Sequence, residues 1–144
     1  MKKQILSLFC IVTLLIACSG RTAENSMEAS AASQKHVIIW SIKGNKLKYH
    51  KAYWASEYLN AQDWENIIGG GKRKAIKISP KATYYLLKAP AYDKLHKVSK
   101  EKFIKNLFDT SKYKENGKTW YWGMACKLTI KNGKVVKFVQ EFQS

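Results

Sequence analysis

The clearest pattern of apolar and polar positions lies near the C-terminus of the chain. Apolar residues occupy every even position over 120–130, with mostly small or polar residues between them. This period of two predicts a β-strand that buries one face. After Asn132 and Gly133, apolar residues return at even positions over 136–142, which predicts a second strand and a hairpin.

The turn of this hairpin decides which side chains face each other. A two-residue loop would place Leu128 opposite Lys137, whereas a three-residue loop over 131–133 places Leu128 opposite Val136 and keeps the apolar faces together. The longer loop also gives Gly133 the left-handed position of a turn followed by a bulge. We therefore predict the three-residue loop. Its other pairs are Ile130 with Lys134, Cys126 with Phe138 and Trp122 with Phe142.

A second hairpin is predicted at the start of the domain. Apolar residues alternate over 38–42 and again over 47–53, and Gly44 and Asn45 lie between the two runs. A glycine in the first position suits a two-residue turn.

The middle of the chain is less regular. Residues 75–78 alternate as a short strand, whereas 82–88 are ambiguous. Ser79 and Pro80 could begin a helix there, but the β-branched and aromatic content of 82–88 favours a strand.

Two helices are predicted between these strands. The first covers 55–68, or only 61–68 if Asn60 is its cap, and the three glycines of 69–71 end it. The second covers about 100–109 behind the cap Ser99, and its apolar stripe faces the core. The resulting order, β-β-α-β-β-α-β-β, predicts an α+β domain, in which two helices pack on one face of a mostly antiparallel sheet of about six strands.

The first eighteen residues have the features of a targeting segment. Two lysines follow Met1, and 5–17 are almost entirely apolar. Thirteen helical residues span about 20 Å, too little for a hydrocarbon core of about 30 Å, so the segment has the form of a secretory signal. The stretch Leu15-Ile16-Ala17-Cys18 resembles the lipobox of bacterial lipoprotein precursors. An ordinary signal peptide or a short membrane anchor are the alternatives.

The resemblance implies three parts and a location. Residues 1–17 would be a cleaved signal peptide, Cys18 would carry the lipid, and 18–35, which are small and polar, would form a flexible tether. Residues 36–144 would form one basic globular domain, held by its lipid outside the cytoplasm in the bacterial cell envelope. In a Gram-negative host, Ser19 after the cysteine resembles an outer-membrane signal.

Positive charge is the strongest chemical signal in the domain. The chain of 144 residues has 26 lysine and arginine residues against 10 acidic ones, a net charge of +16. Nearly all the basic residues are lysines, which favours diffuse attraction to an anionic polymer, a lipid surface or an acidic protein over bidentate recognition of nucleic acid. Trp54 and Tyr121 are expected either to be exposed aromatics or to belong to a second small core under the other face of the sheet. The candidate residues for binding an anionic partner are Lys72, Arg73, Lys74, Lys77, Lys97 and Lys100.

The cysteine and histidine residues indicate neither a disulfide nor a metal site. Cys126 is the one cysteine left after the signal and the lipid site, so no internal disulfide forms, and we expect it to be a buried, inert side chain. The three histidines lack metal-ligand spacing, so neither a metal nor a cofactor is expected. His50 is expected at the surface of its strand.

Three functions remain open. The first is a non-catalytic envelope lipoprotein whose basic domain binds an anionic partner. The second is an envelope enzyme acting on glycans, and the third is a nucleic-acid binder at the cell surface. The enzyme would need a pocket that brings together two of the scattered carboxylates Glu57, Asp63, Glu65, Asp93 and Glu141.

Overall fold

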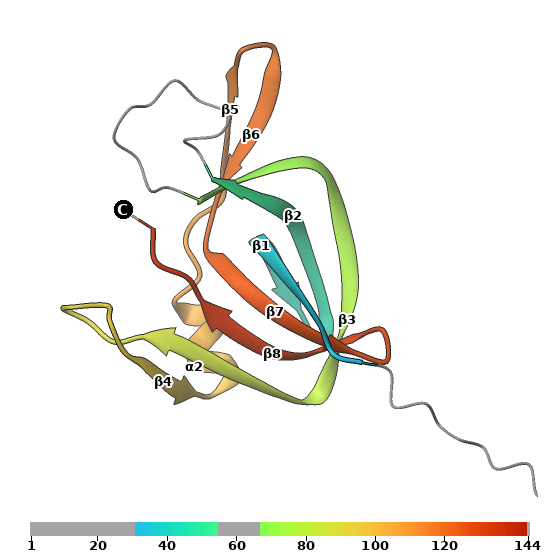
Figure 1. The fold of residues 1–144 in the computed structure, drawn as a ribbon, viewed down its shortest axis with the longest axis vertical. Helices are drawn as coiled ribbons and strands as arrows, with labels where there is room; N and C mark the ends of the chain where they lie inside the picture. Colours follow the sequence, from blue (N-terminus) through green and yellow to red (C-terminus); the bar gives the residue numbers. More distant parts are fainter. Residues whose placement is uncertain (1–30, 55–66, 144) are drawn as a thin grey trace, which may run out of the picture.

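The computed structural model describes residues 31–54 and 67–143. These form eight strands in one mixed sheet and one short helix (Figure 1). The strands are β1 (Ser33–Lys43), β2 (Lys46–Trp54), β3 (Ile67–Leu87), β4 (Leu95–Val98), β5 (Ser111–Glu115), β6 (Lys118–Trp122), β7 (Ala125–Lys131) and β8 (Lys134–Gln140), and the helix is α2 (Lys100–Lys105). The predicted α+β domain with two helices over a six-stranded antiparallel sheet is therefore wrong.

Five of the strands close into a barrel. β1 pairs with β2, β2 with β3, β3 with β8, β8 with β7, and β7 returns to β1. Only the pair of β3 and β8 is parallel. A closed circuit of five strands in this order, with a helix between β3 and β7, has the Greek-key connectivity of the OB-fold. The β5–β6 hairpin extends from one end of the barrel, where β6 pairs with β3 (Figure 1).

A sheet that closes on itself covers its own apolar face. Within the described residues, the core therefore needs no second helix to cover it. Side chains from all five barrel strands fill the interior. Phe103 of α2 is completely buried against the rings of Tyr84 and Phe138, so this short helix contributes to the same core. The buried residues of this core all lie between Val37 and Phe138. A chain that begins after Cys18 therefore contains every one of them.

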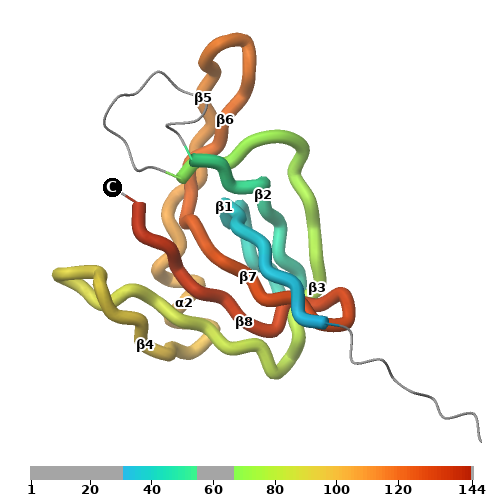
Figure 2. Tube along the Cα trace, in the orientation of Figure 1, coloured from blue at the N-terminus to red at the C-terminus, as the bar shows by residue number. Residues whose placement is uncertain are grey.

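β3 is the longest strand and corrects the prediction for the middle of the chain. It runs through the three glycines of 69–71, which were predicted to end a helix (Figure 2). Ile67 and Ile68 belong to this strand, and the rest of the predicted helix lies outside the described residues. Gly69 packs closely against the neighbouring strands, because a Cβ there would lie 3.0 Å from side-chain atoms of His50 and Ile38.

The second half of β3 confirms the strand predicted over 82–88. Pro80, which has no N–H to donate, lies where the register between β3 and β8 shifts, between Ile78 and Thr83. The proline thus falls outside the regular ladder and does not interrupt the strand.

The alternating run over 120–130 was predicted to form one strand. It belongs to two, because β6 ends at Trp122 and β7 begins at Ala125. A Cβ at Gly123 would lie 2.8 Å from the carbonyl oxygen of Ile39, so only glycine fits there. The N–H of Ile39 donates to the carbonyl of Met124 at 2.9 Å. The β5–β6 hairpin was missed, although Asn116 and Gly117, both at positive φ, are a strong turn signal.

The register predicted for the last hairpin is wrong. The loop has two residues, Asn132 at φ 49° and Gly133 at φ 67°, and Lys131 lies opposite Lys134. A register shift next to Ile130 then brings Leu128 opposite Phe138, so a bulge, rather than a longer loop, keeps the apolar faces together.

The first hairpin and the second helix were predicted more closely. Lys43 lies opposite Lys46, which confirms the two-residue turn with Gly44 in first position. The Ser99 hydroxyl accepts from the N–H of Lys102 at 3.1 Å, as expected for the cap of α2. The helix ends at Lys105, earlier than predicted, and Phe108 beyond it is 41% exposed.

Candidate functional site

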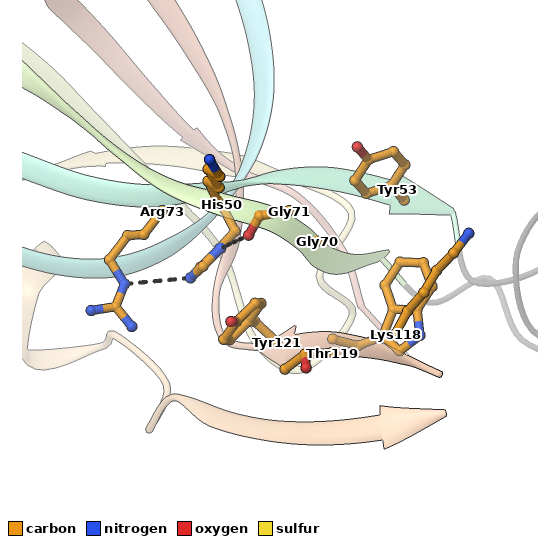
Figure 3. A pocket seen from close by; sticks show the side chains of 10 residues that line it. His50, Tyr53, Gly70, Gly71, Arg73, Lys118, Thr119 and Tyr121 are labelled. Atoms are coloured by element: carbon orange, nitrogen blue, oxygen red, sulfur yellow. Dashed lines mark hydrogen bonds between the residues drawn. The ribbon is translucent and has the colours of Figure 1, made fainter. Parts of the chain in front are cut away.

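A bulge in β3 builds the most distinctive cluster of polar side chains. The register of β2 and β3 shifts around His50, which lies opposite the three residues 71–73 of β3. Gly71 allows this excursion because its φ is +72°, a conformation that other residues rarely adopt. The bulge places Arg73 beside His50 (Figure 3), and Lys72 lines the same cavity at the base of the β5–β6 hairpin.

The ring of His50 is held on three sides. Its Nδ1 donates to the carbonyl oxygen of Gly71 at 3.0 Å, and its Nε2 accepts from Nε of Arg73 at 3.5 Å (Figure 3). The ring of Tyr121 stacks on it, with centroids 3.6 Å apart and planes at 11°. These contacts assign the proton to Nδ1 of a neutral imidazole. His50 is only 1% exposed, so the expectation that it lies at the surface is wrong.

The charge state of His50 follows from its surroundings. Burial lowers the pKa of the His50 ring below its usual value, and the positive charge of Arg73 lowers it further. The hydrogen bond to Gly71 acts in the opposite direction without reversing the shift. His50 is therefore uncharged at neutral pH, and it accepts a hydrogen bond from Arg73 instead of repelling it.

Arg73 is also fixed by an aromatic ring. Its guanidinium carbon lies 3.8 Å from the ring centroid of Trp40, a close cation–π contact. Trp40 in turn meets the rings of His50 and Tyr121 edge to face, with centroids 5.6 and 5.8 Å apart. Within 31–54 and 67–143, no hydrogen bond or ion pair engages the terminal amino groups of Arg73. The contacts with Trp40 and His50 therefore hold the guanidinium in place.

This cluster borders a cavity of about 650 Å³ between β2, β3 and β6. Aromatic rings and glycine backbone form its walls, and cationic side chains lie around them (Figure 3). None of the described lining residues is acidic. The lining residues are His50, Tyr53, Gly70, Gly71, Lys72, Arg73, Lys118, Thr119, Trp120 and Tyr121.

The cations of the cavity are not neutralised by described carboxylates. The ion pair found in the described part of the chain joins His36 to Glu141 at 2.8 Å, and neither of these residues lines the cavity. Lys72, Arg73 and Lys118 therefore give the cavity a positive potential.

The six basic residues predicted from the sequence to bind an anionic partner lie at different places in the structure. Lys72 and Arg73 line the cavity, whereas Lys74 and Lys77 follow on β3 outside its lining. Lys97 lies on β4. Lys100, at the start of α2, has a structural contact, because its Nζ donates to the carbonyl of Gly44 at 2.7 Å and to Asn45 Oδ1 at 3.2 Å. The six candidates therefore do not form one binding surface.

Sequence reasoning missed His50, Trp40 and Lys118. No local pattern indicated them, because their places depend on pairing between strands. The bulge in β3 lies opposite His50, Lys118 comes with β6, and Trp40 is the residue of β1 where the register with β2 shifts. Trp54 is exposed as expected, at 49%. Tyr121 is half-buried and forms part of the cavity wall.

The residues considered for other chemistry lie elsewhere. Glu57, Asp63 and Glu65 lie outside the described residues, and Asp93 and Glu141 do not line the cavity. No group of histidine, cysteine and carboxylate side chains in the described ranges could hold a metal ion. Cys126 is fully buried, and burial raises the pKa of its thiol, which disfavours the reactive thiolate.

Comparison with known proteins gives no relative. The chain matches no known protein family, no curated protein and no solved structure. Among the described residues, no helix has the length and apolar character needed to cross a membrane.

The neutral state of His50 predicts a dependence of stability on pH. Its pKa is lower in the folded than in the unfolded state, so the unfolded chain binds the proton more readily. Stability should fall as the pH drops below about 6.5, by at most about 2 kcal/mol at pH 5. Urea unfolding at pH 7.5 and pH 5 measures the loss.

A His50→Gln variant provides the reference, because glutamine does not titrate. The variant should lose less stability between the two pH values than the wild type. Equal losses in the two proteins would show that folding does not lower the pKa of His50.

Proposed function

We propose that the chain is a cell-envelope lipoprotein whose basic barrel binds an anionic polymer of the envelope, without catalysis. The observation that supports this function best is the cavity beside Arg73. There, Trp40 and His50 hold the guanidinium of Arg73 in place. Two further cations, Lys72 and Lys118, and several aromatic rings line the same cavity. Cationic side chains bind the negatively charged groups of a polymer, and aromatic side chains pack against the faces of its sugar rings.

An anionic saccharide agrees best with this combination. Arginine forms paired hydrogen bonds with carboxylate, sulfate-like or phosphate oxygens, and its geometry here is preorganised. The half-buried rings of Tyr53 and Tyr121 offer surfaces to sugar rings. OB-fold barrels bind oligosaccharides and oligonucleotides on the face of their second and third strands. The cavity of this chain lies on β2 and β3, and the analogy of fold supports the same use.

The location rests on the lipobox-like sequence. A lipid on Cys18 would hold the barrel at the envelope membrane, outside the cytoplasm, where charged polysaccharides are available partners. The signal segment over 1–17 would be removed.

Single-stranded nucleic acid is the second candidate. Basic side chains interleaved with aromatic rings on an OB-fold barrel are also typical of proteins that bind single strands. The small number of arginines in the domain favours the saccharide, because arginine is the preferred reader of bases and phosphates.

A binding panel tests the proposal. The chain beginning at Ser19 would be titrated with a sulfated hexasaccharide, an oligouronate, a neutral maltohexaose and a single-stranded oligonucleotide across a salt series. We expect an anionic saccharide to bind, to weaken with salt and to change the tryptophan fluorescence, while maltohexaose does not bind. Tighter binding of the oligonucleotide would favour the second candidate. Equal weak binding to every member would refute a specific cavity ligand.

A further inference from the structure

A row of lysines crosses the outside of the barrel away from the cavity. Lys43 lies opposite Lys46, Lys46 opposite Lys77, Lys77 opposite Lys134, and Lys134 opposite Lys131. All five are exposed. The lysine row therefore spans β1, β2, β3, β8 and β7 in turn, which are the five strands of the barrel.

This arrangement is unfavourable for the isolated protein. Like charges directly opposite each other destabilise a sheet. Within the described residues, none of the five lysines forms an ion pair that would offset the repulsion. An anionic surface laid against the row would relieve the repulsion at several positions together.

The chain enters the barrel next to the lysine row. Ser33, the first residue of β1, pairs with Ile130, the neighbour of Lys131. Figure 1 shows the start of β1 beside the turn between β7 and β8. Only fourteen residues separate Cys18 from Ser33, and fourteen residues span at most about 50 Å. A lipid on Cys18 would therefore keep the entry point of the barrel, and the lysine row beside it, within about 50 Å of the bilayer.

We propose that the lysine row docks on the anionic phospholipid headgroups of the bilayer that holds the chain. Lysine suits this partner, because its ammonium is a compact, hydrated point charge that interacts with headgroups without a fixed geometry. The docked barrel presents a defined orientation. The β5–β6 hairpin lies away from the point where the chain enters β1 (Figure 1), and residues 118–121 of β6 line the cavity. This inference goes beyond the proposed function, because it uses a surface separate from the cavity.

Vesicle co-sedimentation of the chain beginning at Ser19, which lacks the lipid site, tests the proposal. We expect binding to vesicles of phosphatidylglycerol with phosphatidylcholine and none to phosphatidylcholine alone. Binding should disappear between 0.1 M and 1 M salt, as the Debye length falls from about 10 Å to about 3 Å. Replacing Lys46, Lys77 and Lys134 with glutamine should lower the partition coefficient about a hundredfold.

A matched control removes the same charge elsewhere. Replacing Lys97, Lys112 and Lys114 with glutamine should change vesicle binding less than about threefold, since these residues lie on β4 and β5. Equal losses in the two triple variants would overturn the proposal. Unchanged binding of the lysine-row variant would do so too. Soluble polyphosphate could instead bind as tightly as the vesicles and lose binding in the lysine-row variant. That result would overturn the bilayer as the partner and indicate an anionic polymer.

Two further measurements show whether a loss of vesicle binding comes from the lysine row itself, from unfolding or from the cavity. Urea unfolding should show that the lysine-row variant is as stable as the wild type or more stable, because facing like charges are removed. Lost vesicle binding would then not reflect unfolding. Arg73→Gln should leave vesicle binding within about twofold of the wild type, so failure of the docking proposal and failure of the saccharide proposal are distinguishable.

Discussion

Arg73→Gln is expected to weaken binding of an anionic saccharide to the cavity about ten- to a hundredfold, the range for losing hydrogen bonds to a charged group. The guanidinium is held by Trp40 at 3.8 Å and by His50 at 3.5 Å, so little entropy is lost when a ligand binds to it. Glutamine removes both the charge and the fork of donors. Isothermal titration with the saccharide selected by the panel measures the change.

Two further variants separate charge from geometry. Arg73→Lys keeps the positive charge but loses the paired donors, so its affinity should lie between those of the wild type and Arg73→Gln. Lys105→Gln, which removes one exposed charge from α2, should change affinity less than about twofold. A loss at Lys105 equal to that at Arg73 would mean that binding follows net charge, not the cavity.

Phe138→Ala is expected to destabilise the barrel by about 3–5 kcal/mol, the range for removing a large buried aromatic side chain. Phe138 is completely buried on β8. Its ring stacks on Tyr84, with centroids 4.8 Å apart, and meets Phe103 at 5.5 Å. The side chain therefore joins β8, β3 and α2 inside one core. Urea unfolding of the chain beginning at Ser19 measures the loss.

Conservative and exposed replacements keep this prediction testable. Phe138→Leu retains most of the volume and should cost about 1–2 kcal/mol, so it remains measurable if the alanine variant does not fold. Phe142→Ala removes the same ring from a position that is 51% exposed, and should change stability by about 0.5 kcal/mol or less. A similar small loss at Phe138 would show that the barrel interior is not closed around it.

Several elements were predictable because their signals are local. The cap at Ser99, the turn at Gly44 and the alternation over 75–78 depend on neighbouring residues, and each appears in the structure. The Asn116-Gly117 turn carried the same kind of signal and was overlooked. The glycines over 69–71 were misinterpreted, because a run of glycine can end a helix or permit close packing of a strand, and only the neighbours across the sheet distinguish the two.

The candidate site was predictable only in part. Basic composition selected Lys72, Arg73, Lys97 and Lys100 as binders of an anionic partner. Lys72 and Arg73 line the cavity, whereas Lys97 and Lys100 lie elsewhere. His50 was placed at the surface by its polar character. It is buried because a bulge in β3 closes over it and supplies the carbonyl of Gly71, which accepts a hydrogen bond from Nδ1 of His50.

The sequence by itself determined the positive charge, the lipobox-like segment, the caps and turns, and which residues of most strands are apolar, because these depend on composition and short-range order. The tertiary structure decided the closure of five strands into a barrel, the meeting of Arg73 with Trp40 and His50, and the lysine row. Those features depend on strand register, and a shift of one residue would turn each side chain to the other face. Register is selected by the packing of the whole core, so no local pattern contains it.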